Sequence, residues 1–555
     1  MFRRALIAVP CAGLALSLFA CGSDHNNNST AQNSLQTATP IKHLVVIYGE
    51  NVSFDHYFGT YPNATNPAGE PAFSPAAGTP SANILTGTLL TANPNLNTAN
   101  GTGAANPFRL DRTQAATADQ NHAYTAEQQA NDNGAADLFP KFTGKGSSGG
   151  VGAFGTTGQV MGYFDGNTVT GLWNYAQKFS MSDNAWTSTY GPSTPGALEV
   201  VSGQTNGVQI LKTTASPSTV AKSSFFINDG QGGITMINDV DPGNDVCSSQ
   251  TDQVLMSGKN IGDLLNAKSI TWGGFMGGFN LSTTNPNGTT GCKRSTVATA
   301  VGAATADYIP HHNWFQYYTS TANPQHTRPS STAAIGYSTE SDGKTPEPAN
   351  HQYDTDDFFA SVKAGNYPSV SFLKAPAAQD AHAGYSDPLD EQQFVTKVVN
   401  FLQQQPDWNS TAVIVTYDDS DGWYDHVFMP PVHGSFDAQA DQLNGAGVCG
   451  TTGTQPAGVN GGAVNGRCGP GTRIPFLVIS PWAKTNYVDH TFVDQASVVR
   501  FIEDNWLSGQ RIGGGSFDAT SGSIMSMFDF SNGGKNPTLF LDQTQGTPVS
   551  SVPAI

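Results

Sequence analysis

Acidic and amide side chains stand at the ends of two apolar segments that have the length of buried strands. They are Glu50 and Asn51, after HLVVIYG at 43–49, and Asp418 and Asp419, after TAVIVTY at 411–417. In open parallel sheets, ligands bind beyond the carboxyl ends of the strands. If both segments are parallel strands of one sheet, we expect these four side chains to project into a single crevice.

A divalent metal ion explains why two carboxylates should be adjacent at such a position. Neighbouring strand residues point to opposite faces, so Asp418 and Asp419 converge only where the pleat breaks. Convergence brings like charges together, which raises one pKa strongly unless a cation intervenes. Oxygen ligands favour Ca²⁺, Mg²⁺, Mn²⁺ or iron over a structural zinc ion. The alternatives are a solvated acidic turn at 418–419 and a helix cap supplied by Asn51 or Ser53.

A candidate nucleophile lies in the segment TSTYGPSTPGALEVVSGQ at 187–204. Ser193 follows Gly191 and Pro192 in a tight turn that is expected to open a helix, where backbone N–H groups receive an anion. The segment is not the Gly-x-Ser-x-Gly elbow of lipases, because Pro195 stands where the second glycine is needed. The alternative for Ser193 is a simple N-cap of the helix.

Four histidines in polar segments supply the third element of a possible site. They are His122 in DQNHAY, His311 and His312 in YIPHHNWF, and His382 in QDAHAGYSDP. Imidazoles of this kind neutralise or orient a phosphate group, or protonate a leaving group. The alternative for each of them, taken singly, is a structural role.

The order of apolar segments predicts an α/β fold with a mainly parallel central sheet that helices cover on both faces. Strand-like and helix-like segments alternate through LWNYAQKF, IGDLLNAKSITWGGFM, FFASVKAGNYPSVSFLKAP, DEQQFVTKVVNFLQQQPDWNSTAVIVTYDD, RIPFLVISPWAK and DQASVVRFIEDNWL. Long segments rich in Gly, Asn, Thr and Ala separate them, at 76–106, 203–256, 320–350 and 436–470. We expect these segments to be loop insertions on one core.

The composition describes a globular chain whose charge argues against one class of partner. Of 555 residues, 38% are hydrophobic, which is enough for a large core. Lys and Arg number 25 against 43 Asp and Glu, for a formal net charge of −18. Binding to a nucleic-acid backbone needs Lys- and Arg-rich surfaces, so no nucleic-acid partner is expected.

The N-terminus predicts export. Residues 1–20 carry two arginines followed by an apolar run, the layout of a secretory signal peptide. LFAC at 18–21 resembles the lipobox of bacterial lipoproteins, which makes Cys21 the expected lipid anchor and the expected membrane contact; ordinary cleavage is the alternative. Residues 21–39 are read as a polar tether. We therefore expect a protein of the periplasm, lipid-anchored at the outer membrane, or secreted, because no later segment is long and apolar enough to span a bilayer.

Four further cysteines suggest two disulfides in an exported chain, with three possible pairings. Proximity in the sequence favours Cys247–Cys292 and Cys449–Cys468. A zinc site is the weaker alternative, because the chain has no Cys-x-x-Cys spacing.

Seven motifs follow one another between about residues 40 and 530: GENVSFDHYFGTYPN, DQNHAY, YGPSTPGALEVVSGQ, PHHNWFQYY, DAHAGYSDP, TYDDSDGWYDHV and GPGTRIPFLVISPWAKTNYVDHTFVDQASVVRFIEDNW. In this order they resemble the bacterial phosphoesterase family that unites phospholipases C with the acid phosphatase A type. The resemblance implies an alkaline-phosphatase-like core, a single catalytic domain over 40–555 and one divalent metal ion.

The resemblance also implies roles for the residues above. Glu50, Asn51, Asp418 and Asp419 match the metal ligands, and Ser193 matches a nucleophile that also touches the metal. Asn51, His122, His311, His312 and His382 match residues around the phosphate. A serine activated in this way forms a phosphoserine intermediate. Protonated His122 or His382 is then expected to donate to the leaving oxygen, which favours activity below neutral pH.

The nucleophile turn separates the two branches of this family. The phospholipase pattern Gly-Pro-Thr-x-Pro-Asn-Arg is replaced here by Ser193, with Gly196 and Ala197 after Pro195. The missing Arg favours a phosphatase acting on small phosphomonoesters over a phospholipase C-type phosphodiesterase. A third alternative is a surface lipoprotein that keeps the fold for adhesion without turnover. The sequence predicts no oligomeric state.

Overall fold

The computed structural model describes residues 36–553 except 149, 214–223 and 244. The expected signal peptide, Cys21 and most of the expected tether lie outside the described residues. The chain joins the core within the last residues of that tether, because Ala38 N donates to Asn505 O at 2.9 Å and Thr39 Oγ1 donates to Asn505 Oδ1 at 2.8 Å.

The centre of the described chain is an eight-stranded sheet with the order β14-β11-β15-β1-β16-β17-β4-β18. Its members are β1 (His43–Gly49), β4 (Ser180–Ser182), β11 (Trp272–Met276), β14 (Gln352–Tyr353), β15 (Val370–Lys374), β16 (Thr411–Tyr417), β17 (Phe476–Ile479) and β18 (Tyr487–Asp489). The first five strands in this order are parallel, whereas β17 runs antiparallel to both β16 and β4. The expectation of a mainly parallel α/β fold is confirmed, and the arrangement is consistent with an alkaline-phosphatase-like core.

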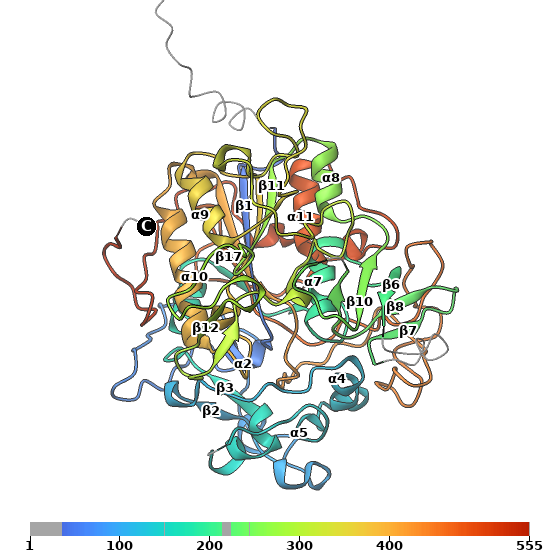
Figure 1. Ribbon diagram of the computed structural model, residues 1–555. Coiled ribbons are helices and arrows are strands. Elements are labelled where there is room, and N and C mark those ends of the chain that lie inside the picture. Colours follow the sequence, from blue (N-terminus) through green and yellow to red (C-terminus); the bar gives the residue numbers. More distant parts are fainter. Residues whose placement is uncertain (1–35, 149, 214–223, 244, 554–555) are drawn as a thin grey trace, which may run out of the picture.

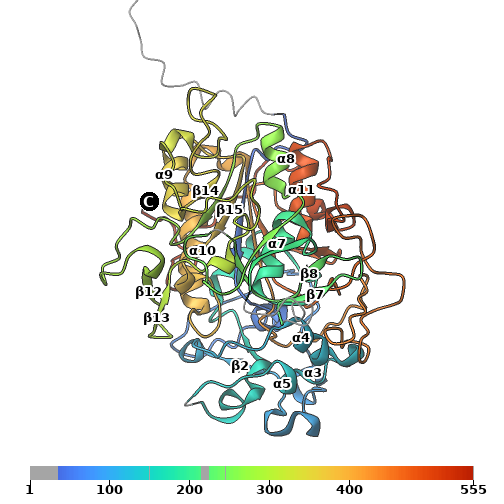
Figure 2. The same cartoon turned by 45° about the vertical axis from the view of Figure 1, so that its right-hand side comes forward.

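Helices cover the sheet on both sides. Figure 1 shows α9 (Thr355–Lys363) and α10 (Pro388–Gln403) on one side, and α7 (Ser193–Ser202), α8 (Ile261–Ala267) and α11 (Ala496–Trp506) on the other; Figure 2 shows the same separation. The helix α6 (Thr170–Lys178) contacts α10. Because both faces are covered, every residue of β1 and β16 is buried, which explains their continuous apolar sequences.

The longest helix, α10, begins with a side-chain cap. Asp387 is its N-cap, and its side chain accepts hydrogen bonds from Leu389 N and Asp390 N at 2.9 and 3.0 Å. Pro388 occupies the first turn, where a missing N–H costs nothing.

Smaller elements lie outside this core. The segment below the sheet in Figure 1 holds α2 (Phe54–Phe58), α3 (Thr88–Thr91), α4 (Tyr124–Asn131), α5 (Phe139–Phe142), β2 (Phe108–Leu110) and β3 (Gly162–Phe164). It lies beyond the carboxyl end of β1, which leads directly into α2. Two short strand pairs are β5 (Ala185–Trp186) with β19 (Val493–Asp494) and β12 (Ser295–Val297) with β13 (Ala304–Ala306).

The segment 203–256, expected to be a loop insertion, contains strands of its own. They are β6 (Val208–Lys212), β9 (Asp241–Pro242) and β10 (Gln253–Met256) in one small sheet, and β7 (Phe226–Asn228) with β8 (Ile234–Met236) in a hairpin. These strands are only two to five residues long, which is too short for their sequence to show the apolar runs that mark the central strands.

Both expected disulfides are confirmed. Cys247 bonds to Cys292 and Cys449 bonds to Cys468. Of the helices within the described residues, none combines the length and the apolar character needed to cross a membrane.

Candidate active site

Three neighbouring parallel strands end at one edge of the sheet, and the residues at their ends form the candidate site. β1 lies between β15 and β16, so Lys374 at the end of β15 lies beside Glu50 and Asn51, which follow β1. Asp418 and Asp419 follow β16 at the same edge. All five side chains are at most 1% exposed. Asn51 has a φ of 55°, a left-handed conformation that asparagine tolerates better than most residues, and this turn ends the strand.

A glycine allows the helix α7 to approach this edge. A Cβ at Gly196 would overlap the carbonyl group of Asp418, so only glycine permits the close contact between α7 and the end of β16. Tyr48 in β1 donates a hydrogen bond from its hydroxyl to Gly196 O at 2.7 Å. The first turn of α7, which begins at Ser193, is thereby held against the acidic side chains.

Ser193 is the centre of the cluster. Its Oγ lies 2.9 Å from Glu50 Oε2, 3.2 Å from Asn51 Oδ1 and 3.2 Å from Asp419 Oδ2. The side chain does not cap its helix, because the N-cap is Pro192 and makes no side-chain capping bond. The helix-cap alternative applies only to Ser53, whose Oγ caps α2 by accepting from His56 N at 3.2 Å.

The donor set fits a cation. One end of the Asn51 amide lies 2.7 Å from Glu50 Oε2, 3.1 Å from Asp418 Oδ1 and 3.2 Å from Asp419 Oδ2, and the other end lies 3.1 Å from His382 Nε2. If the NH₂ group of Asn51 faces the carboxylates, it donates hydrogen bonds to them. If the amide oxygen faces them instead, a positive charge must lie between this oxygen and the carboxylates. Asp418 Oδ2 is also buried and has no hydrogen-bond partner among the described residues. Buried oxygens gathered in this way fit a divalent ion.

The shifts in the pKa values of the carboxylates also favour a bound cation. Burial, and then the neighbouring Asp418 charge, raise the pKa of Glu50 and of Asp419 well above the ordinary values. Burial also works to raise the pKa of Asp418, but the Lys374 ammonium and hydrogen bonds to the carboxylate outweigh it, and this pKa is lowered. Without a cation, the surroundings therefore favour the protonated forms of Glu50 and Asp419, whereas a bound divalent ion would favour their ionised forms.

Sequence reasoning missed Lys374. The ammonium forms an ion pair with Glu50 Oε1 and lies 3.8 Å from Asp418 Oδ2. Lys374 could have been found from its position at the carboxyl end of the strand VSFLK. Ligands bind beyond the carboxyl ends of parallel strands, and the same rule identified Glu50. Asp380 was also missed as a member of the cluster; its Oδ2 lies 3.9 Å from His312 Nδ1.

The four histidines surround the serine cluster. His122 Nε2 lies 3.4 Å from Asn51 Nδ2, and His312 Nδ1 lies 3.1 Å from Glu50 Oε1. The ring of His382 lies 6.1 Å from that of His122 and 6.2 Å from that of His312, and His311 adjoins His312 at 4.5 Å, centroid to centroid. His311 has the most exposed side chain of the four, at 30%, with His122 next at 13%. The structure thus brings all the predicted site residues together, with His311 and His122 on the solvent side.

Two of the histidines differ sharply in basicity. Burial works to lower the pKa of His122, but the carboxylates of Asp419 and Asp421 outweigh it and raise this pKa well above its ordinary value. His122 Nδ1 lies 3.0 Å from Asp421 Oδ1. Burial raises the pKa of Asp421 itself to about 7, against the effect of this bond, so the pair titrates as a unit and we assign its shared proton to His122. Burial lowers the pKa of His382 to about 4, which leaves this ring neutral near pH 7.

The other two histidines form a second contrasting pair. Burial works to lower the pKa of His311, but its bond to Asp241 and nearby carboxylates raise this pKa. Burial and then the His311 charge lower the pKa of His312 well below its ordinary value. The surroundings therefore favour the protonated form of His122 and His311 and the neutral form of His312 and His382.

The residues just after Asp419 are buried and do not form a solvated turn. Trp423 is 1% exposed and stacks on His56 with centroids 3.8 Å apart. Asp425 Oδ1 lies 2.9 Å from Arg473 Nε, in a buried ion pair that the sequence did not suggest. These contacts pack the segment after Asp419 into the protein interior.

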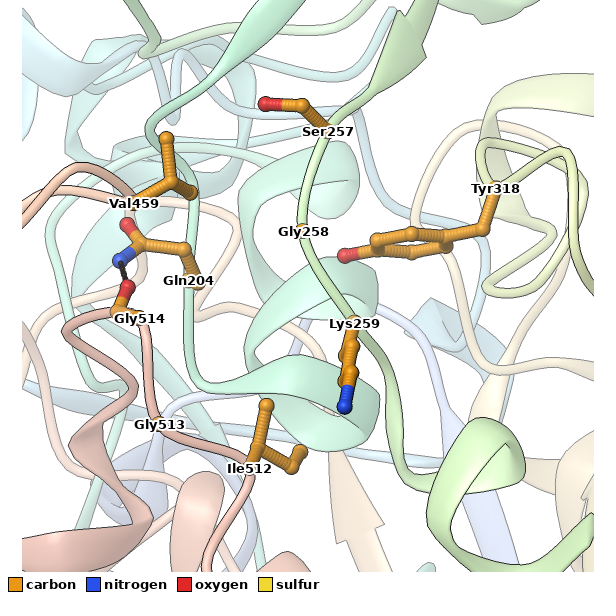
Figure 3. Close-up of a pocket in the computed structure, with 9 residues that line it drawn as sticks. All are labelled: Gln204, Ser257, Gly258, Lys259, Tyr318, Val459, Ile512, Gly513 and Gly514. Carbon is orange, nitrogen blue, oxygen red and sulfur yellow. Dashed lines mark hydrogen bonds between the residues drawn. The ribbon is translucent and has the colours of Figure 1, made fainter. Parts of the chain in front are cut away.

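One well-formed cavity lies away from these residues. Its volume is about 210 Å³, and it opens near Gln204, just past the end of α7 opposite to Ser193, with Lys259, Tyr318 and glycines 258, 513 and 514 in its wall (Figure 3). It contains none of the predicted site residues. We locate the chemistry at the strand ends because the ligand-type side chains converge there.

Comparison with known proteins agrees with the sequence motifs. Residues 41–507 match the family model described as the phosphoesterase family. The chain is 32% identical over 189 residues to a non-hemolytic phospholipase C of Pseudomonas aeruginosa, covering 32% of this chain and 25% of the relative. It is 33% identical over 176 residues to a non-hemolytic phospholipase C of Burkholderia pseudomallei (31% and 24% covered), and 30% identical over 148 residues to non-specific phospholipase C6 of Arabidopsis thaliana (25% and 24% covered). The chain spans about a quarter of the length of these curated relatives.

Proposed function

The chain belongs to the phosphoesterase family, and on that premise we propose that it is a metal-dependent acid phosphatase that hydrolyses small phosphomonoesters through Ser193. The observation that carries the proposal is the contact of Ser193 Oγ with Glu50, Asn51 and Asp419 inside a ring of four histidines. A substrate reaches this serine from the side of His122 and His311, which are the more exposed rings.

Glu50, Asn51, Asp418, Asp419 and Ser193 would hold the metal. A divalent ion at these oxygens supplies positive charge that lowers the pKa of the serine hydroxyl and favours the anionic phosphate group. Ca²⁺, Mg²⁺, Mn²⁺ and iron all suit such a donor set.

The chain's own residues account for the rest of the reaction. The Ser193 hydroxyl releases its proton to solvent, and Oγ attacks phosphorus in line, forming the bond to the serine oxygen as the bond to the leaving oxygen breaks. His122, with its raised pKa, gives its proton to the leaving oxygen, whereas His382 is neutral and suits phosphate orientation. His311 and His312 are placed to contact the phosphate oxygens. Water then attacks phosphorus, the bond between phosphorus and Ser193 Oγ breaks to release phosphate, and His122 accepts a proton from that water.

Hydrolysis of phosphodiesters is the second candidate. The three relatives named above are all phospholipases C, which favours it. Gly196 and Ala197 favour the monoesterase instead, because the turn lacks the Arg that would add a further positive charge beside the substrate.

Two chromogenic substrates test the proposal. We expect the wild type to hydrolyse p-nitrophenyl phosphate faster than p-nitrophenyl phosphorylcholine, and Ser193→Ala and chelator-treated protein to lose at least about 10³-fold in kcat for the faster substrate. Preference for the choline ester contradicts the monoesterase and favours the phospholipase. Turnover of neither substrate favours the adhesive lipoprotein.

A further inference from the structure

A buried ammonium group lies where a second set of metal ligands converges. Glu50, His312 and Asp380 each offer one ligand atom, and these atoms all lie within 4.8 Å of one another. His312 Nδ1 is 3.1 Å from Glu50 Oε1 and 3.9 Å from Asp380 Oδ2. Imidazole nitrogen is a usual ligand of zinc and iron, and carboxylate oxygen binds zinc and manganese. The Lys374 ammonium contacts the same oxygen, Glu50 Oε1.

The two carboxylate oxygens of Glu50 face two different positions that a positive charge can occupy. Its Oε2 faces Ser193 at 2.9 Å, whereas its Oε1 faces Lys374 and His312. Among the described residues, neither Lys374 Nζ nor His312 Nδ1 has a hydrogen-bond partner of normal geometry. A buried polar group without such a partner is costly, so both groups depend on the neighbouring carboxylates.

One metal ion and one ammonium leave the carboxylates close to charge balance. Glu50, Asp380, Asp418 and Asp419 together carry four negative charges when ionised, whereas a divalent ion beside Ser193 and the Lys374 ammonium supply three positive charges. A second divalent ion would raise the positive charge to five. Lys374 is 1% exposed and its Nζ lies 5.2 Å from the centroid of the Tyr48 ring, so the ammonium is enclosed at the end of its strand.

We propose that the Lys374 ammonium occupies the place of a second metal ion. Glu50, His312 and Asp380 then form a latent divalent-metal site, and the Lys374 side chain excludes an ion from it. A second ion would compete with the ammonium for Glu50 Oε1 and would bring more positive charge than the carboxylates balance. The inference deepens the proposed function and rests on it for the ion beside Ser193.

Counting bound ions tests this proposal without any assay of activity. Metal-free full-length protein is loaded with excess Zn²⁺ or Mn²⁺, separated from free ions and measured by elemental analysis. We expect Lys374→Met, which keeps the length and removes the charge, to bind one ion per chain more than the wild type. Lys374→Arg keeps the charge and should bind the wild-type number. Adding His312→Ala to Lys374→Met should return the count to that of the wild type.

A second variant keeps the proposal testable if Lys374→Met does not fold. His312→Ala alone should leave the wild-type ion count unchanged, because in the wild type no ion is held there. Loss of one ion in His312→Ala, or equal counts in Lys374→Met and wild type, overturns the inference. A wild type that binds no ion contradicts the proposed metal at Ser193, while the difference between the wild type and Lys374→Met still decides the role of Lys374.

Discussion

The pair of His122 and Asp421 sets the pH at which activity should be lost. His122 Nδ1 lies 3.0 Å from Asp421 Oδ1, and the Asp421 side chain is fully buried. A hydrogen bond to a charged group contributes about 1.5–3 kcal/mol. This energy favours the protonated ring, so losing the Asp421 charge lowers the pKa of His122. The substitution Asp421→Asn keeps the size and one acceptor oxygen but removes the charge.

The sign of the expected shift follows from the role of His122 as proton donor. Activity requires the protonated ring, so it is lost as the pH rises through the pKa of His122. Asp421→Asn lowers that pKa, so the alkaline limb of the kcat/KM profile with p-nitrophenyl phosphate should move to lower pH by about 1–2 units. The profile is measured beside that of the wild type, so that ionisation of the substrate affects both equally.

Asp119 provides the matched control. Its Oδ1 lies 3.6 Å from His122 Nδ1, but its side chain is 46% exposed, so solvent screens its charge. Asp119→Asn should move the limb by less than about 0.5 unit, as expected for an exposed pair. An unchanged limb in Asp421→Asn, or an equal shift in Asp119→Asn, would refute the assignment of His122 as the acid.

Three further predictions concern support of the site. Gly196→Ala places a methyl group against the Asp418 carbonyl and should cost about 1–3 kcal/mol of unfolding free energy with a fall in kcat; unchanged urea denaturation and kcat contradict the close contact. Replacing Cys449 and Cys468 by serine opens a loop of sequence separation 19 and should cost about 3 kcal/mol, seen as a lower urea midpoint; an unaltered midpoint contradicts this. Chelation should lower the melting temperature, and divalent ions should restore it, because an ion bound at 100 times its Kd stabilises by about 2.7 kcal/mol; an unchanged melting temperature argues against bound metal.

Much of the site could be predicted because the end of a buried strand can be recognised in the sequence, where an apolar run is followed by polar residues. Apolar runs located β1 and β16, and the polar residues after them had to share one edge once the strands were parallel. Ser193 was found from its glycine- and proline-bounded turn. The fold class followed from the same alternation of strands and helices.

Long-range pairing could not be predicted in the same way. Lys374 is separated from Glu50 by more than 300 residues, and a lysine that ends a strand gives no local signal of the carboxylate that neutralises it. Arg473 and Asp425 show the same limit, because only the fold brings their charges together. The short strands of 203–256 were missed because cross-strand hydrogen bonds, which local sequence does not report, define them.

Trapping the covalent intermediate tests the central claim most directly. The enzyme is mixed with a ³²P-labelled phosphomonoester, quenched in acid within the first turnover and digested for peptide mapping. We expect label on the peptide that contains Ser193, in an acid-stable phosphoester, and no label in Ser193→Ala. Acid-labile label on a histidine peptide, or label that persists in Ser193→Ala, would contradict it.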